Sequence, residues 1–228
     1  MKNIDFHAHI LPKADHGSDS LETSLKQIEL SANANIDIII ATPHFYPHRH
    51  SLENFIEKRK ESYSLLKYNS DFKVILGAEV LLCDNIDRLE NLDALCIENT
   101  KILLIELPFS DFRNEYITSV ERLISNGYTV VLAHVERYPK ENIEKLISLG
   151  ALLQCNASAF SKIFIKGHIK KWLKEGLIVA LGSDIHKADT DAYKKVIKAK
   201  KKLADEYENI MKKTETLLYE KNQVAVNA

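Results

Sequence analysis

Cysteine is scarce in this sequence of 228 residues. The three cysteines, Cys83, Cys96 and Cys155, form no CxxC pair and leave an odd count. This argues against a disulfide framework and is typical of a protein in a reducing compartment. Cys155 lies in an apolar run, so we expect it to pack in a core.

Long apolar runs and linkers are missing as well. No apolar run approaches the roughly 20 residues needed to cross a bilayer. The first residues, MKNIDFHAHI, have no apolar stretch behind the lysine, so we expect no signal peptide and a cytoplasmic protein. No Pro/Gly/Ser-rich linker divides the chain, which predicts a single domain over residues 1–228.

The sequence has no charge surplus, because 31 Lys and Arg oppose 32 Asp and Glu, for a net charge of -1. A nucleic-acid-binding protein usually carries a basic surplus. We therefore predict no nucleic-acid partner. The lysine-rich stretch from residue 189 to about 220 is predicted to be a C-terminal helix with a solvated charged face.

What is present is an alternation of short β-branched runs with polar stretches of helical periodicity. Ser51 and the pair Asp19 and Ser20 are candidate helix N-caps, and Pro139 suits a first helical turn. The alternation predicts an α/β fold with a parallel sheet, best fitted by a (β/α)7 barrel of the TIM type, one unit short. The expected strands are Ile4–Ile10, Asp37–Thr42, Lys73–Gly77, Ile102–Leu107, Thr129–Ala133, Leu152–Cys155 and Ile178–Gly182.

Six of these seven expected strands end on His, Asp or Glu, and in such barrels chemistry gathers at the carboxyl ends of the strands. His7 and His9 alternate along a strand, so they share one face. Glu106 follows an apolar run, where burying an unpaired carboxylate would cost several kcal/mol. The candidate ligands at the strand ends are His7, His9, His44, Glu79, Glu106, His134, Asp184 and His186, with His16 in the first loop.

Taken alone, each of these histidines is more often a surface or core residue than a ligand. Together they predict a metal centre. Imidazole and carboxylate ligands without a thiolate suit zinc, manganese or iron, and the ligand count implies two or three ions. Adjacent divalent ions favour phosphoryl chemistry, because they lower the pKa of a bound water and stabilise charge on the reacting oxygens.

This ordered set resembles the PHP (polymerase and histidinol phosphatase) superfamily. The segments HAHILP, DHG, ATPHF, GAEV, LIELPF, AHVERY and SDIH resemble its bacterial protein-tyrosine phosphatases of capsule and exopolysaccharide synthesis. The resemblance runs from residue 1 to about residue 187. It implies a distorted seven-stranded barrel with three metal ions, manganese being favoured for activity.

The resemblance also implies how the ligands are shared. Arg137 matches the phosphate-binding arginine, and a guanidinium suits phosphate through bidentate hydrogen bonds. The alternative for Arg137 is a salt bridge with Glu136 or a helix-end charge. By position, the ligand sets are His7, His9, Glu79 and Asp184 for one ion, Glu79, Glu106 and His134 for a second, and His16, His44 and His186 for a third.

Two departures from the phosphatases concern the site. His16 stands where they usually have aspartate, in Asp15-His16-Gly17, although other PHP members carry histidine there. After His186 the relatives continue with asparagine and then a phosphate-binding arginine, whereas this chain has Lys187-Ala188-Asp189-Thr190. Lys187 replaces the charge but not the forked geometry of arginine.

The predicted mechanism is direct hydrolysis without a covalent phospho-enzyme, since no cysteine begins a Cys-x5-Arg loop. Arg137 would offset charge on the phosphate, and Asp15 is a possible proton donor for an alkoxide leaving group. A substrate ring could stack on a wall formed by Phe45, Tyr46, Phe109 and Phe112, and core or loop packing is the alternative for these residues.

The resemblance implies a phosphotyrosine protein as substrate, namely the tyrosine-rich tail of a membrane-associated bacterial tyrosine kinase, and homo-oligomers occur among relatives. Three alternatives stay open at this point. They are a histidinol-phosphate or other small-molecule phosphatase, a phosphodiesterase or exonuclease, and a non-catalytic module that binds the kinase tail.

Overall fold

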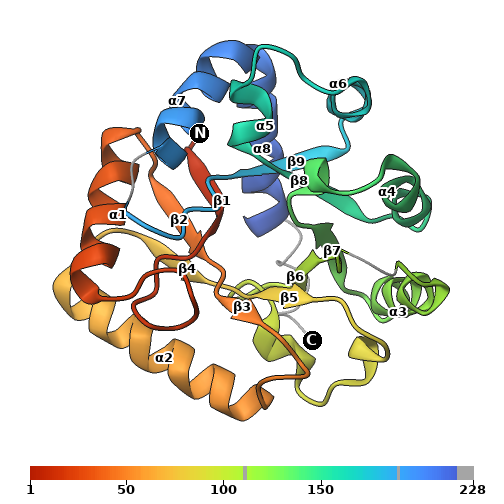
Figure 1. The fold of residues 1–228 in the computed structure, drawn as a ribbon, viewed down its shortest axis with the longest axis horizontal. Coiled ribbons are helices and arrows are strands. Elements are labelled where there is room, and N and C mark those ends of the chain that lie inside the picture. Colours follow the sequence, from red (N-terminus) through yellow and green to blue (C-terminus); the bar gives the residue numbers. More distant parts are fainter. Residues whose placement is uncertain (110–111, 189–190, 220–228) are drawn as a thin grey trace.

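The computed structural model describes residues 1–109, 112–188 and 191–219. Strands lie at the centre and helices surround them (Figure 1). The strands are β1 (Ile4–Ala8), β2 (Ile38–Ala41), β3 (His44–Phe45), β4 (Val74–Leu76), β5 (Glu79–Leu81), β6 (Ile102–Glu106), β7 (Thr129–Leu132), β8 (Leu152–Asn156) and β9 (Ile178–Gly182). All seven expected runs contain a strand, and an α/β fold with parallel pairing is confirmed.

The strands form two parallel sheets. One has the order β1-β2-β4 and the other the order β3-β5-β6-β7-β8-β9. Strands β2, β6 and β9 are buried along their whole length, which explains why their sequences are almost continuously apolar. Two pairings set up the site, because His44 lies opposite Glu79 and Leu81 lies opposite Glu106.

The structure differs here from the single seven-stranded barrel that the sequence predicts. The described residues form no closed barrel, and two extra strands, β3 and β5, follow breaks after β2 and β4. Pro43 stands in the first break and has no N–H to continue the hydrogen-bond ladder. Its carbonyl still accepts a hydrogen bond from the Glu79 N–H at 3.1 Å, so the chain bends there but stays attached.

Most helices lie between consecutive strands. They are α1 (Leu21–Asn33), α2 (Leu52–Asn69), α3 (Asn114–Ser125), α4 (Lys140–Ile147), α5 (Ala157–Ser161) and α6 (Gly167–Lys174), with the 3-10 helices η1 (Ile86–Arg88), η2 (Leu92–Leu95) and η3 (Val135–Arg137). Two predicted caps are confirmed. The Ser20 side chain accepts from the Thr23 N–H at 3.1 Å, and the Ser51 side chain accepts from the Asn54 N–H at 3.2 Å.

The lysine-rich stretch forms two helices rather than one, α7 (Asp191–Leu203) and α8 (Asp205–Tyr219). Ala204 separates them with a positive φ of 47°. A continuous helix over these 29 residues would run roughly 43 Å in one direction. The break lets α7 pack against α5 while α8 packs beneath β9 and β1.

Among the described residues, no helix combines the length and apolarity needed to span a bilayer.

Candidate metal centre

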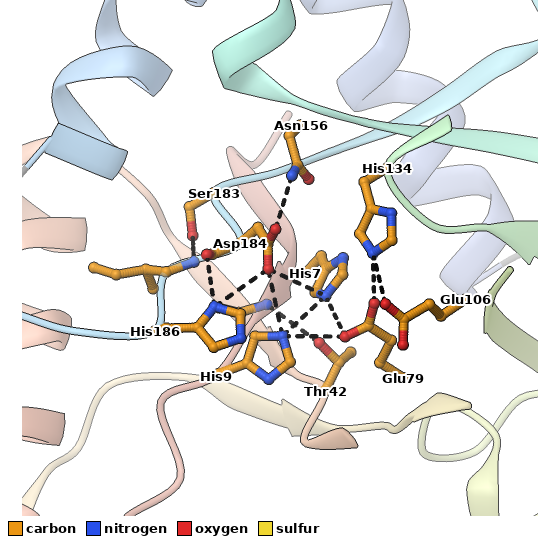
Figure 2. Close-up of polar contacts among 12 residues, drawn as sticks. His7, His9, Thr42, Glu79, Glu106, His134, Asn156, Ser183, Asp184 and His186 are labelled. Atoms are coloured by element: carbon orange, nitrogen blue, oxygen red, sulfur yellow. Dashed lines mark hydrogen bonds and ion pairs between the residues drawn. The ribbon is translucent and has the colours of Figure 1, made fainter. Parts of the chain in front are cut away.

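The predicted ligands of the strand ends converge on one site. Figure 2 shows the side chains of all of them except His44 pointing toward one another, and His44 joins them through Glu79 and His186. Strand alternation places His7 and His9 on one face of β1, and their Nε2 atoms lie 3.1 Å apart. The in-register pairing of β3 with β5 brings His44 beside Glu79. His134 and Asp184 have positive φ angles of 34° and 54°, a rare backbone conformation that turns both side chains toward the site.

The first predicted ligand set is brought together completely. Glu79 Oε2 lies 3.1 Å from His7 Nε2 and 3.2 Å from His9 Nε2. Asp184 Oδ1 lies 3.7 Å and 3.5 Å from the same two nitrogen atoms. Four donor atoms around one point, all from buried side chains, are the arrangement that a divalent ion needs.

The second set is also assembled, on the other side of Glu79. His134 Nε2 lies 2.7 Å from Glu79 Oε1 and 3.7 Å from Glu106 Oε1. Glu79 therefore presents one carboxylate oxygen to each of the two sets. A carboxylate in that position can bridge two cations.

In the third set, His44 and His186 lie close together, but His16 is not the residue nearest to them. His44 Nε2 and His186 Nε2 lie 3.5 Å apart, and the exposed His16 ring stacks on His44 with ring centroids 4.6 Å apart. The donor atoms that gather most closely with His44 and His186 belong to His9 rather than His16. The Nδ1 atom of His44 also faces Glu79 Oε2 at 2.9 Å, so His44 can contribute to the second set as well.

The electrostatics of the cluster fit a bound cation. Burial and the charge of Glu79 raise the pKa of Glu106 to about 8, which shows the cost of placing two carboxylates together. Burial and the charge of His9 lower the pKa of His186 to about 4, so its imidazole is neutral with a free lone pair at pH 7. Among the described residues, the buried Glu79 Oε2 and His44 Nδ1 atoms make no hydrogen bond. The two atoms lie at ion-pair distance from each other instead, and buried donor atoms crowded together in this way suit metal ligands.

Asp15 holds two of the predicted ligands in place. Its Oδ2 accepts from His9 Nδ1 at 2.7 Å and from the His44 N–H at 2.9 Å, and its Oδ1 accepts from the Gly17 N–H at 2.8 Å. Gly17 is required there, since a Cβ would lie 2.4 Å from the Cβ of His9. Although burial opposes it, the hydrogen bond and charge of His9 hold the pKa of Asp15 well below its usual value. These contacts favour an orienting role for Asp15 toward His9, and its role as a proton donor stays a prediction.

Two residues of the site were missed by the sequence analysis, and both lie on β8, the one expected strand without a predicted ligand. Gln154 Oε1 accepts from the His134 N–H at 2.6 Å and lies 3.3 Å from His7 Nδ1. Gln154 Nε2 donates to Asn156 Oδ1 at 3.0 Å, and Asn156 Nδ2 donates to Asp184 Oδ2 at 2.9 Å. The signal was available, because polar residues 154 and 156 alternate in a buried strand and so share one face.

The chain as a whole is similar to a known family of proteins. A family model described as capsular polysaccharide synthesis, CpsB/CapC, matches residues 3–226. The chain belongs to the CpsB/CapC family. The predicted resemblance to the bacterial capsule phosphatases is thereby confirmed.

Relatives of known name that are similar in sequence are named tyrosine-protein phosphatases. A putative tyrosine-protein phosphatase CapC of Staphylococcus aureus is 30% identical over 200 residues, which cover 80% of this chain and 76% of the relative. A tyrosine-protein phosphatase CpsB of Streptococcus agalactiae is 28% identical over 205 residues, covering 82% and 84% of the two chains.

The fold is shared with a solved structure. It is described as YwqE from Bacillus subtilis and CpsB from Streptococcus pneumoniae, unique metal-dependent tyrosine phosphatases, and it superposes with a TM-score of 0.76. The match covers 96% of this chain and 95% of that chain at 24% identity, so it shows the likeness of the fold.

In this CpsB/CapC protein, Arg137 opens onto a pocket of about 490 Å³ beside the ligand cluster. Its guanidinium Nη2 donates to Asp184 Oδ2, and its side chain is 38% exposed. Its carboxylate partner is thus the predicted ligand Asp184 rather than Glu136. Lys187 lines the same pocket, whereas Asp189 and Thr190 lie outside the described residues.

The predicted aromatic wall is only partly available to a substrate. Phe45 is 1% exposed and packs on Phe55 in the core, so it presents no face to the pocket in this structure. Phe109 is 73% exposed, and its ring lies 5.7 Å from the ring of Tyr138, which in turn lies 5.6 Å from His134. Tyr46 stacks on His44 with ring centroids 5.0 Å apart, and Phe112 packs on Tyr116.

Proposed function

We propose that this protein is a metal-dependent protein-tyrosine phosphatase of capsule or exopolysaccharide synthesis. One observation carries the proposal most directly. Both oxygens of the buried Glu79 carboxylate face predicted ligand sets, with Oε2 near His7 and His9 and Oε1 near His134. The names of the CpsB/CapC relatives supply the substrate class, phosphotyrosine in a protein.

The residues suited to hold the ions are His7, His9, His16, His44, Glu79, Glu106, His134, Asp184 and His186. Bound divalent ions would supply Lewis acidity toward the phosphate oxygens and a water of lowered pKa. The chain itself contributes orientation. Asp15 fixes His9 through its Nδ1–H, and Gln154 fixes the backbone of His134.

Arg137 is proposed to bind the phosphate of the substrate. Its guanidinium lies at the mouth of the pocket, against Asp184. A planar fork of N–H donors matches two phosphate oxygens and opposes the charge that builds on them. Lys187 adds a positive charge to the same pocket, and the exposed Phe109 ring is proposed to contact the tyrosine ring.

We also propose that the two sheets are parts of one distorted seven-stranded barrel. The Asp184 N–H donates to the His7 carbonyl at 2.8 Å, and the His9 N–H donates to the Ile185 carbonyl at 3.0 Å, which supports an attachment of the segment after β9 to the end of β1. A single domain, a cytoplasmic location, manganese, homo-oligomers and a membrane-associated tyrosine kinase as partner remain predictions.

The decisive experiment combines metal content with turnover. The protein, purified without chelator, would be analysed by plasma mass spectrometry and assayed with p-nitrophenyl phosphate, a phosphotyrosine peptide, histidinol phosphate and single-stranded DNA. We expect two to three metal ions per chain, preference for the phosphotyrosine peptide, and activity that EDTA removes and manganese restores.

Two substitutions accompany this measurement. His134→Ala should abolish turnover and keep the fold, whereas His168→Ala, a control on α6 against Trp172, should retain turnover. Turnover of histidinol phosphate that exceeds turnover of the phosphotyrosine peptide by orders of magnitude would reject the proposal of a tyrosine phosphatase. A chain with neither metal nor turnover would favour the binding-only alternative.

A further inference from the structure

A smaller pocket of about 210 Å³ opens beside the larger one. It is formed mainly by α5, by the start of α6 and by the loop of residues 162–166 between them (Figure 1). The two pockets share Arg137 and Ser158. A polypeptide that places one side chain in the larger pocket therefore has the smaller pocket next to it.

The smaller pocket has an apolar lining with an exposed aromatic side chain. Ile169 and Ala159 are buried at 1% and 8% exposure, and Ile165 is half-buried against the core. Phe164, also in the lining, is 85% exposed, and its neighbour Ile163 is 86% exposed. Contiguous apolar side chains exposed beside a pocket and rimmed by polar residues are a feature of binding surfaces.

The charge around this pocket is positive. Lys162, Lys166 and Arg137 line it, and within the described residues neither lysine has a carboxylate within 4.0 Å. Lys166 Nζ instead donates to the backbone carbonyl of Glu136 at 2.8 Å. The Glu136 side chain, the one acidic group among the lining residues, is directed at the Asn156 N–H, 3.2 Å from its Oε2.

The loop is tied to the body of the protein. Lys202 Nζ, on α7, donates to the backbone carbonyls of Lys162 and Ile163, the latter at 3.1 Å. This attachment holds Lys162 and Phe164 at the pocket edge before any ligand arrives. A binding surface that is already ordered costs less conformational entropy on binding.

We propose that this pocket is a specificity subsite for an acidic segment of the polypeptide substrate that flanks the phosphotyrosine. Carboxylates of the segment would pair with Lys162 and Lys166, and an apolar side chain would pack on Phe164. The subsite rests on the proposed function, because it needs a polypeptide rather than a small phosphomonoester. It predicts a preference that depends on residues outside the phosphotyrosine.

The test compares two phosphotyrosine peptides of equal length, one with acidic and one with alanine flanking residues. The readout is the ratio of their kcat/KM values, which cancels any general loss of activity. Wild-type protein should favour the acidic peptide. Lys162→Glu and Phe164→Ala should each lower the ratio about fivefold, the effect of roughly 1 kcal/mol at a partly exposed contact. Lys166 is left intact because it also holds the Glu136 carbonyl.

A matched control reverses charge elsewhere. Lys60 is exposed on α2, at a distance from α6 (Figure 1), and Lys60→Glu should leave the ratio unchanged. An unchanged ratio in Lys162→Glu and Phe164→Ala would overturn the subsite alone. The same result with loss of binding to phosphatidylserine vesicles would assign the loop to a membrane surface. If wild type hydrolyses p-nitrophenyl phosphate but neither peptide, the proposed function fails and the subsite with it.

Discussion

The Gln154 side chain accepts a 2.6 Å hydrogen bond from the backbone N–H of His134, with the same oxygen 3.3 Å from Nδ1 of His7. One amide thereby touches two predicted ligands that are 127 positions apart in the chain. Asn156 extends the contact to Asp184. Residues behind metal ligands fix their orientation and raise metal affinity.

Gln154→Leu should therefore weaken metal binding about 10- to 100-fold, the usual effect of removing a partner of a metal ligand. Isothermal titration of manganese into the metal-free protein measures this directly, and the melting temperature of the metal-free form checks the fold. Gln154→Glu, which keeps the acceptor for the His134 N–H, should retain more affinity than Gln154→Leu. Equal manganese affinity in wild type and Gln154→Leu would show that the amide has only a packing role.

Asp15→Asn should lower kcat/KM about 10- to 100-fold on aryl phosphates, because the carboxylate orients His9. The leaving group distinguishes orientation from proton donation. An orienting role predicts equal losses with p-nitrophenyl phosphate and phenyl phosphate. A proton donor would be needed more by the poorer leaving group, so a much larger loss with phenyl phosphate would contradict the orienting role.

Arg137→Lys should lower kcat/KM about 10- to 100-fold, since lysine keeps the charge but loses the bidentate fork. The matched control is Arg113→Lys, because Arg113 is also a partly exposed arginine paired with a carboxylate, Asp84, at 3.3 Å. That variant should behave as wild type with p-nitrophenyl phosphate. Comparable activity of the two variants would remove Arg137 from phosphate binding.

The three cysteines should differ in reactivity. Burial raises the pKa of all three thiols, to about 12 for Cys96, but Cys96 and Cys155 are buried from solvent whereas Cys83 is only half-buried. A raised thiol pKa means less thiolate at pH 8, and the thiolate is the reactive form. Ellman's reagent at pH 8 should titrate at most one thiol per native chain, assigned to Cys83, and three after unfolding. More than one reactive native thiol would contradict the packing of β8 or of the loop at Cys96.

The sequence alone located seven of the nine described strands and the candidate ligands that the structure brings together. Both features could be predicted because each depends on a short stretch of sequence. A short β-branched run predicts a strand, and parallel strands joined by helices place their carboxyl ends together. His7, Glu79, His134 and Asp184 were therefore assigned to one site from their positions alone, and the structure brings their donor atoms within 4 Å of neighbouring groups.

Other features depended on packing between distant segments. Phe45 follows a predicted ligand and was assigned to the substrate wall, yet tertiary packing buries it on Phe55. Ala204 breaks the C-terminal helix so that α8 can cover β9, although alanine itself favours helix. Asp15 contacts both His9 and the backbone of His44, which no local pattern of residues indicated.

By itself, then, the sequence determined the α/β class, the strand positions and the residues that gather at their ends, since periodicity and residue type encode these directly. The tertiary structure alone decided how each side chain is oriented and paired. It placed β3 and β5 in a different sheet from β2 and β4, paired Arg137 with Asp184, and brought the amides of β8 against the predicted ligands His7, His134 and Asp184. Those contacts join residues far apart in the chain, so no local pattern of residues encodes them.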